Sequence, residues 1–570
     1  MSVSDKTVVP KVDLVTRGSH GISFFQSGGG PEHEFVDRGA PSTSPDCRVI
    51  AFSPDGTQLA WCDGKSVHVI DATTLESRQT IPKSKTRHIQ FSPLGTHVVT
   101  WEPYAILQGQ SVGDPNLEIW TGGEKTAEFI QKSQHNWCPQ WSDDEQLCAR
   151  NVTNEVHFFD GGLLPGASAV SRKLQVENLT TFALSPGKSP CRIACYVPGT
   201  KGAPSFVRLY EYPRLEGPGS ILANKSFYRA DSVTFLWNRK GSGLLVLTNT
   251  EVDKTGGSYY GEQGLHYLSV RGDGNMVPLP KKGPIYSVEW NPDSEDFCVV
   301  YGFMPSVATL FSCKCEPIFE FGTAHRNCVN YNPQGNIICL SGFGNLKGSM
   351  EFWDRSKLKL ISSPVAPNTT QLEWSPDGIY VATATNAPRL RVDNGFKVWH
   401  FTGSLLFSQD TAPKKELWEV KWRPALAGTY PAPDPAQRPP PSSAQQIPEA
   451  KQAAAYVPPA LRGKTRPKGD APPAKVPPRG RRRDQGAGHD NSHSGEQGEA
   501  VATAKSIVGE ETKEGGSEKE KKVKQLKKKL KQIEQIKQQE AEGKVLEVNQ
   551  VEKIRMEQAF LEELRTLELS

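Results

Sequence analysis

A short turn motif recurs along the first three quarters of this chain and constrains its fold more than any other feature. The motif, which we call the tetrad, is an aromatic residue, Ser or Asn, Pro and a variable residue, usually followed by Gly. Four clear copies read Phe52-Ser53-Pro54-Asp55-Gly56, Phe91-Ser92-Pro93-Leu94-Gly95, Tyr331-Asn332-Pro333-Gln334-Gly335 and Trp374-Ser375-Pro376-Asp377-Gly378. Five degenerate copies begin at Trp141, Leu184, Trp237, Trp290 and Trp422. Their spacing, from 39 residues (Phe52 to Phe91) to 53 (Trp237 to Trp290), is typical of four-stranded propeller blades.

The residue types of the tetrad indicate a hairpin turn independently of its period. Proline presets the backbone for the first corner, Asp or Asn bonds back to the local backbone, and Gly accepts the left-handed conformation. Alternating apolar runs surround the first tetrad at residues 48–52, 58–62 and 67–71, in the order strand, turn, strand, turn, strand. The alternative is a β-sandwich with coincidental Ser-Pro turns, and the period argues against it.

The two ends of the repeat array predict how a ring would close. The chain turns proline-rich directly after Trp422, so its last blade has one strand, at 417–422, and lacks three. Residues 12–15, 21–25 and 34–36 can supply them, and this exchange removes exposed strand edges. We therefore predict one closed, nine-bladed, all-β propeller over residues 1–424. Because nine exceeds the common range, two smaller rings or a false degenerate tetrad are the alternatives.

Composition narrows the class of protein. The sequence has no run of 18 apolar residues and no apolar core of a signal peptide near Met1, so we expect a soluble, cytoplasmic protein without membrane contact. Its 11 cysteines all lie between Cys47 and Cys339, which is typical of buried thiols in a reducing compartment. Cys313-Lys314-Cys315 could form half of a metal site, but we expect strand alternation to point the two thiols to opposite faces.

One glycine-rich run superficially resembles a phosphate-binding loop. Gly342-Phe343-Gly344 and Gly348 lie between predicted strands, however, and neither a Lys-Ser/Thr pair nor a helix start follows them. Turn glycines explain the run. The sequence also has no Gly-x-Ser-x-Gly, no His-Glu-x-x-His and no paired Cys-x-x-Cys motif. We therefore expect no catalytic site, no cofactor and no metal.

Charge separates the ring from the tail. Residues 1–430 carry 41 Lys and Arg against 42 Asp and Glu, and residues 431–570 carry 26 against 21. The densest part, which we call the basic stretch (residues 462–483), contains one acid, Asp470, and nine basic residues: Arg462, Lys464, Arg466, Lys468, Lys475, Arg479, Arg481, Arg482 and Arg483. Rich in Pro and Gly, it cannot bury apolar surface, so we expect residues 425–516 to form a disordered linker. It either contacts RNA phosphates or is a solvated linker with a localisation signal.

An aromatic and aliphatic segment precedes the basic stretch and overlaps its first residue. It reads Ala455-Tyr456-Val457-Pro458-Pro459-Ala460-Leu461-Arg462. A polyproline conformation would present Tyr456 and Leu461 to a groove at low entropic cost. The candidate residues of a partner-binding motif are therefore Tyr456, Pro458, Pro459, Leu461 and Arg462, and incidental linker composition is the alternative.

The last segment, residues 517–570, has helical periodicity. An apolar stripe of Val523, Leu526, Leu530 and Ile533 runs along a cationic helix that carries the six lysines Lys521, Lys522, Lys524, Lys527, Lys528 and Lys529. After Gly543 a mostly acidic helix follows, and pairing of both stripes and both charge signs predicts an antiparallel α-helical hairpin. We expect this hairpin to dock on a ribonucleoprotein through its lysines, and a homo-oligomeric coiled coil is the alternative.

Several longer runs identify a resemblance that spans the whole chain. They are residues 341–354, residues 91–96, Trp101-Glu102-Pro103-Tyr104 and residues 135–141. With these runs the chain closely resembles the eukaryotic translation initiation factor 2A family. The resemblance implies a monomeric cytoplasmic factor with a nine-bladed propeller that binds the small ribosomal subunit. It also implies start-codon-dependent, GTP-independent delivery of initiator methionyl-tRNA on selected mRNAs, alongside other initiation factors. A propeller scaffold for protein partners, with only incidental RNA contact, is the other hypothesis.

Overall fold

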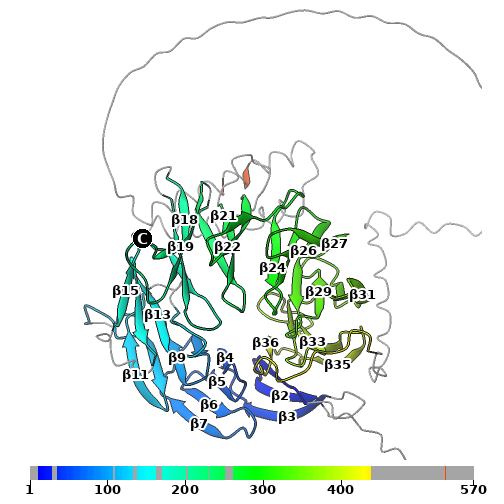
Figure 1. Cartoon of the computed structure of the whole chain (residues 1–570). Helices are drawn as coiled ribbons and strands as arrows, with labels where there is room; N and C mark the ends of the chain where they lie inside the picture. Colours follow the sequence, from blue (N-terminus) through cyan, green and yellow to red (C-terminus); the bar gives the residue numbers. More distant parts are fainter. Residues whose placement is uncertain are drawn as a thin grey trace, which may run out of the picture. The chain divides into compact units, whose positions relative to one another are not determined.

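The structure of the protein, a computed structural model, describes residues 11–27, 35–106, 109–132, 138–161, 170–199, 203–228, 230–250, 261–437, 530 and 533–534. The chain divides into two units, Met1–Pro458 and Pro459–Ser570. Described residues of the first unit form 36 β-strands in nine four-stranded sheets, and the sheets surround a common centre (Figure 1). The predicted nine-bladed β-propeller is confirmed.

Eight blades consist of four consecutive strands each, and the strand that ends in a tetrad is the innermost of the four. The first four blades contain β4 (Val49–Phe52), β5 (Gln58–Cys62), β6 (Val67–Asp71), β7 (Ser77–Ile81); β8 (His88–Phe91), β9 (His97–Trp101), β10 (Leu117–Thr121), β11 (Glu124–Phe129); β12 (Gln140–Trp141), β13 (Leu147–Val152), β14 (Glu155–Asp160), β15 (Arg172–Gln175); and β16 (Thr181–Leu184), β17 (Arg192–Val197), β18 (Ser205–Glu211), β19 (Ile221–Phe227).

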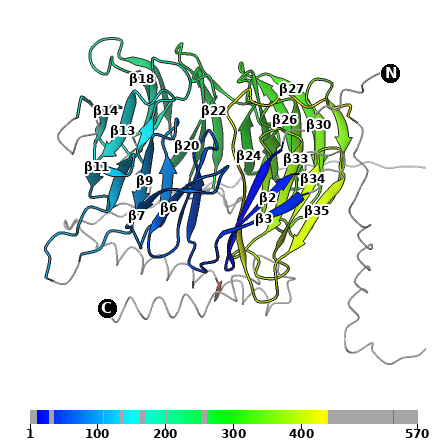
Figure 2. The same ribbon diagram turned by 90° about the horizontal axis from the view of Figure 1, so that it is seen from below.

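The next four blades repeat this plan without a change in strand order. They contain β20 (Ser232–Trp237), β21 (Gly243–Asn249), β22 (Gln263–Ser269), β23 (Gly274–Met276); β24 (Ile285–Trp290), β25 (Asp296–Tyr301), β26 (Ser306–Ser312), β27 (Pro317–Ala324); β28 (Cys328–Tyr331), β29 (Ile337–Ser341), β30 (Met350–Asp354), β31 (Lys359–Ser362); and β32 (Gln371–Trp374), β33 (Tyr380–Thr385), β34 (Gly395–His400), β35 (Leu405–Asp410). Viewed from the side, the strands run through the thickness of the ring (Figure 2).

The ninth blade joins the two ends of the repeat array. Its strands are β36 (Leu417–Trp422), β1 (Asp13–Gly18), β2 (Gly21–Ser27) and β3 (Phe35–Ser42), in the spatial order β3-β2-β1-β36. The C-terminal strand β36 is innermost and pairs antiparallel with β1. The three strands missing from the repeats therefore come from the N-terminal segment, as the sequence predicted.

The apolar core of the ring lies between blades rather than within them. Nine clusters of buried hydrophobic residues occur among the described residues, and each joins two neighbouring blades. Phe24 of the ninth blade and Ile50 of the first, for example, share one cluster. Because a blade is covered on both faces, middle strands such as β29 are buried throughout and read as continuous apolar runs.

In the second unit the structure describes three residues, Leu530, Ile533 and Glu534, and all three are helical. The rest of the predicted hairpin and the linker over 425–516, apart from its first residues up to 437, lie outside the described residues. The domain boundaries at residues 424 and 516 stay predictions. In the part of the chain that the structure describes, no helix has the length and apolar character needed to cross a membrane.

Candidate binding pocket at the axis of the ring

The tetrads form the turns that leave the innermost strands. In the first tetrad the Gly56 amide donates to the Ser53 carbonyl at 2.8 Å, and the Ser53 hydroxyl donates to Asp55 Oδ1 at 2.5 Å. Asp55 Oδ1 also accepts from the Thr57 amide at 3.0 Å. Gly56 has a φ of 72°, in the left-handed region that glycine adopts without strain. The sequence-based interpretation of the tetrad as a tight turn is therefore confirmed.

The nine turns contact one another and form a closed collar around one mouth of the ring. Each contact joins one blade to the next through residues of the turns or of the strand ends beside them. The nine contacts are Gln58 to Gly95, Leu94 to Glu145, Gly187 to Asp143, Gly241 against Pro186, Lys240 to Ser294, Gly335 against Asn291, Gln334 to Pro376, Trp422 to Glu373 and Arg423 to Gly56. The last two contacts pass through the ninth blade. The collar is thus continuous only because β36 and the turn after it occupy the ninth position.

Polar side chains of the innermost strands also reach across to the next blade. Gln371 on β32 mimics a strand pair, because its Oε1 accepts from the Val420 amide at 3.2 Å and its Nε2 donates to the Val420 carbonyl at 2.6 Å. Gln140 on β12 makes the same kind of bridge to β16. These bonds fix the spacing of the inner strands and so the shape of the axial mouth.

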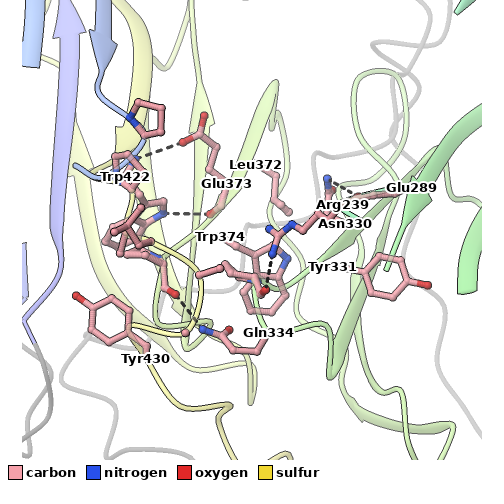
Figure 3. Close-up of a pocket in the computed structure, with 18 residues that line it drawn as sticks. Arg239, Glu289, Asn330, Tyr331, Gln334, Leu372, Glu373, Trp374, Trp422 and Tyr430 are labelled. Atoms are coloured by element: carbon pink, nitrogen blue, oxygen red, sulfur yellow. Dashed lines mark hydrogen bonds between the residues drawn. The ribbon is translucent and has the colours of Figure 1, made fainter. Parts of the chain in front are cut away.

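A pocket of about 830 Å³ opens at this mouth, lined by residues of the fifth to ninth blades and by Pro54 of the first (Figure 3). Four tetrad prolines line it, namely Pro54, Pro333, Pro376 and Pro424. Residues 424–430 follow β36 and form one wall of the pocket, with Tyr430 as the last residue of that wall. Asn336 donates to the carbonyl of Pro433 at 2.7 Å and holds this segment against the seventh blade. The pocket therefore combines turns from several blades with the end of the ring.

Two carboxylates in the pocket wall are only partly compensated for their burial. Burial raises the pKa of Glu289 to about 7, although the Tyr331 amide and Asn330 lie close enough to offset part of it. Burial likewise raises the pKa of Glu373, whose carboxylate accepts from Gln371 Nε2 at 3.0 Å and from the Trp422 amide at 3.3 Å. Among the ion pairs between described residues, none includes either glutamate.

Arg239 is the cationic residue of this pocket wall. Its Nη1 donates to the carbonyl of Pro333 at 3.4 Å, across the turn of the intervening blade. The positive charge of Arg239 lowers the pKa of Glu289, but by less than burial raises it, so the net shift of that pKa is upward. Figure 3 shows Glu373 beside Trp422, and Glu289 beside Asn330. The pocket can therefore accept hydrogen-bond donors and one or more further positive charges.

None of the site residues predicted from the sequence lies in the described part of the chain. The partner-binding motif at 456–462, the basic stretch at 462–483 and the six lysines between 521 and 529 are all outside it. The sequence analysis did not single out Glu289 or Glu373. Each lies directly before the aromatic residue of a tetrad, at a position that faces the axis of the ring. An acidic residue at that position was the signal in the sequence that could have indicated them.

Two smaller predictions have definite outcomes. Residues 342–349 form the turn between β29 and β30, where the Gly342 amide donates to the Ser349 carbonyl at 2.9 Å, so turn glycines do explain that run. The expectation that Cys313 and Cys315 alternate along a strand is wrong. They lie in the turn between β26 and β27, and Cys315 has a φ of 65°. Within the described ranges, no three His, Cys, Asp or Glu side chains gather as a metal site.

The ring is a nine-bladed β-propeller whose blade-to-blade turns line an axial pocket. A profile described as eukaryotic translation initiation factor eIF2A matches residues 225–420. Eukaryotic translation initiation factor 2A of Drosophila melanogaster is 41% identical over 473 residues, or 81% of this chain and 73% of that protein. The protein of the same name in Caenorhabditis elegans is 35% identical over 550 residues, or 91% and 93%.

A solved structure, described as the crystal structure of the eukaryotic initiation factor, superposes with a TM-score of 0.66 at 34% identity. It covers 73% of this chain and 100% of its own. The chain belongs to the eukaryotic translation initiation factor 2A family, as its resemblance indicated.

Proposed function

We propose that this protein binds the small ribosomal subunit and promotes delivery of initiator methionyl-tRNA, dependent on the start codon and independent of GTP. It acts on selected mRNAs, as a cytoplasmic monomer, together with other initiation factors. The observation that carries the proposal is the 41% identity to a factor of this family over 81% of the chain. The density of basic residues at 462–483 and 521–529 supports contact with RNA phosphates.

The division of labour in this proposal follows from charge. The ring is nearly neutral, with 41 basic and 42 acidic residues in positions 1–430, and the excess of positive charge lies in the tail. The linker beyond the described residues, 438–516, then acts as a flexible connection, and residues 517–570 act as a helical hairpin that docks on the ribonucleoprotein. The residues assigned to RNA contact are the basic stretch and the six lysines of the first C-terminal helix.

Two measurements test this proposal. Cosedimentation with purified small ribosomal subunits should recover the full-length protein in the ribosomal fraction. Filter binding should then show that the protein retains initiator methionyl-tRNA on these subunits with an AUG codon, equally well with and without GTP. Retention that requires GTP, or that ignores the codon, would contradict the proposed mechanism.

The second candidate function is a propeller scaffold that recruits protein partners and reaches RNA only incidentally. The axial pocket favours it, because Glu289 and Glu373 disfavour an anionic ligand at this mouth. The same cosedimentation separates the two functions. A scaffold should remain in the supernatant with bare subunits and should enter the ribosomal fraction only when partner proteins are added.

A further inference from the structure

The carboxylates of the axial pocket lack the cation that buried acids normally have. Buried charged groups are usually paired, because the loss of water otherwise disfavours the charged form. Glu289 receives only the long bond from Asn330 Nδ2, at 3.5 Å, and a backbone amide. The nearby cations have other partners: Lys421 pairs with Glu419 at 2.7 Å, and Arg239 donates to the Pro333 carbonyl. The wall therefore offers acceptors to a positive group from outside the ring.

The remainder of the pocket suits an extended peptide chain. Its lining includes four prolines together with Trp374 and Tyr430, and also Trp422 and Tyr331, whose side chains are largely buried. Leu426 at its edge is 59% exposed and adds an apolar contact. Grooves lined with aromatic side chains recognise extended peptides, whose backbone is ordered at low entropic cost. Walls of mixed polar and apolar character that carry carboxylate acceptors are thus more suitable for a peptide than for a nucleic acid backbone.

Arginine is the basic side chain that fits these features best. Its planar guanidinium has five N–H donors, which can bond one carboxylate bidentately while the charge attracts the other, and its faces stack on aromatic rings. We propose that the axial pocket binds an extended segment of a partner protein, with an arginine side chain directed at Glu289 and Glu373. The assignment does not rest on the proposed role in initiation, since it is tested without ribosomes.

The test uses the full-length protein and fluorescein-labelled pentapeptides read by fluorescence anisotropy. The probe is Pro-Ala-Arg-Ala-Pro with blocked ends. Its matched control contains citrulline, which keeps the shape of arginine and removes the charge. The arginine peptide should bind at least tenfold more tightly than the citrulline peptide, because hydrogen bonds to charged groups are about twice as strong as neutral ones. Equal affinities would overturn the proposal.

Variants assign the binding to the pocket. Glu289→Gln and Glu373→Gln should each weaken the arginine peptide about tenfold and leave the citrulline peptide unchanged. Both should fold, because burial already disfavours the charges that they remove. The matched control is Glu295→Gln, an equal charge change on an exposed turn of the sixth blade outside the pocket. If it weakens binding as much, general charge explains the affinity and the pocket assignment fails.

Three further measurements test the site and exclude the other occupants. Ala427→Trp fills the pocket from its exposed wall, keeps both carboxylates, and should abolish peptide binding. Binding that survives this change overturns the site. Displacement of the peptide by excess single-stranded oligouridine would assign the pocket to RNA instead. Removal of residues 438–570 should leave the affinity unchanged, and a tenfold gain would identify the protein's own tail, rather than a partner, as the occupant.

Discussion

Leu14 on β1 lies directly opposite Trp422 on β36, although 408 residues separate them in the chain. Three residues further along, Arg17 forms an ion pair with its cross-strand partner Glu419 at 3.0 Å. It also donates to the carbonyl of Cys47, in the connection that leads into β4 of the first blade. The join between the chain ends is therefore a sheet with its own side-chain contacts, and it is attached to the blade that follows it.

Removal of residues 1–42 should lower the thermal unfolding midpoint of the ring. The deletion leaves β36 as the sole strand of its blade and opens both apolar clusters that the ninth blade shares with its neighbours. Deletion of residues 438–570 is the control and should not change the midpoint of the ring transition. Differential scanning calorimetry of the two truncations measures both, and equal midpoints would contradict the closure argument.

Gly378→Ala should destabilise the ring by about 2–4 kcal/mol. Gly378 has a φ of 70°, and an added Cβ would lie 2.0 Å from Gln334 Oε1 in the neighbouring turn. Gly428→Ala separates the two causes, because Gly428 has a φ of 85° but open space around its Cβ position. Gly428→Ala should therefore lower the free energy of unfolding only through its backbone conformation, by about 1 kcal/mol. Similar urea midpoints for the two variants would show that the collar contact contributes nothing.

Two aspartates at the same tetrad position should respond oppositely to replacement by Asn. Burial raises the pKa of Asp377 to about 6, whereas hydrogen bonds from Ser53 and Thr57 outweigh burial at Asp55 and lower its pKa. Because the folded pKa of Asp377 exceeds its unfolded value of about 4, its ionisation removes stability as pH rises from about 4 to about 6. Asp55 instead contributes stability above about pH 4 and loses it as pH falls.

Asp377→Asn should therefore stabilise the ring at pH 8, by about 1–2 kcal/mol after the cost of one unpaired buried N–H, and should have no benefit at pH 4. Asp55→Asn should destabilise it at pH 8. Urea midpoints of the parent and both variants at the two pH values measure these differences. A stabilising Asp55→Asn, or an Asp377→Asn that loses stability at pH 8, would contradict the assigned causes.

Replacement of Lys521, Lys522, Lys524, Lys527, Lys528 and Lys529 by Gln should weaken association with the small ribosomal subunit and leave the thermal midpoint of the ring unchanged. Lys521, Lys524 and Lys528 share one helical face, so about half of the six reach phosphate together. Each phosphate contact contributes roughly 0.7–0.9 to the slope of log affinity against log salt, so the slope should fall by about two to three units. An unchanged slope would show that the lysines form a solvated surface.

The number of blades and the exchange of strands between the chain ends could be predicted from the sequence because each depends on local chemistry repeated along the chain. Ser53, Pro54 and Gly56 specify a turn wherever they occur, and counting turns counts blades. The axial pocket could not be predicted in this way. Glu289 and Glu373 are 84 residues apart and approach one mouth only after the ring has closed. Their altered pKa values arise from burial by the turns of other blades, which the spacing of tetrads does not report.

Closure through β36 also sets the order of events while the chain is being synthesised. The strands β1 to β3 are complete at residue 42, but their inner partner begins at Leu417, 375 residues later. At about 5–20 residues per second, the edge of β1 remains without its partner for roughly 20–75 seconds on every nascent chain. During that interval the apolar face of this sheet that packs against the eighth blade, with Leu14 and Phe25, also remains uncovered. Chaperones that cover strand edges would therefore engage this protein at its N-terminal sheet, and release of that sheet would coincide with emergence of Trp422.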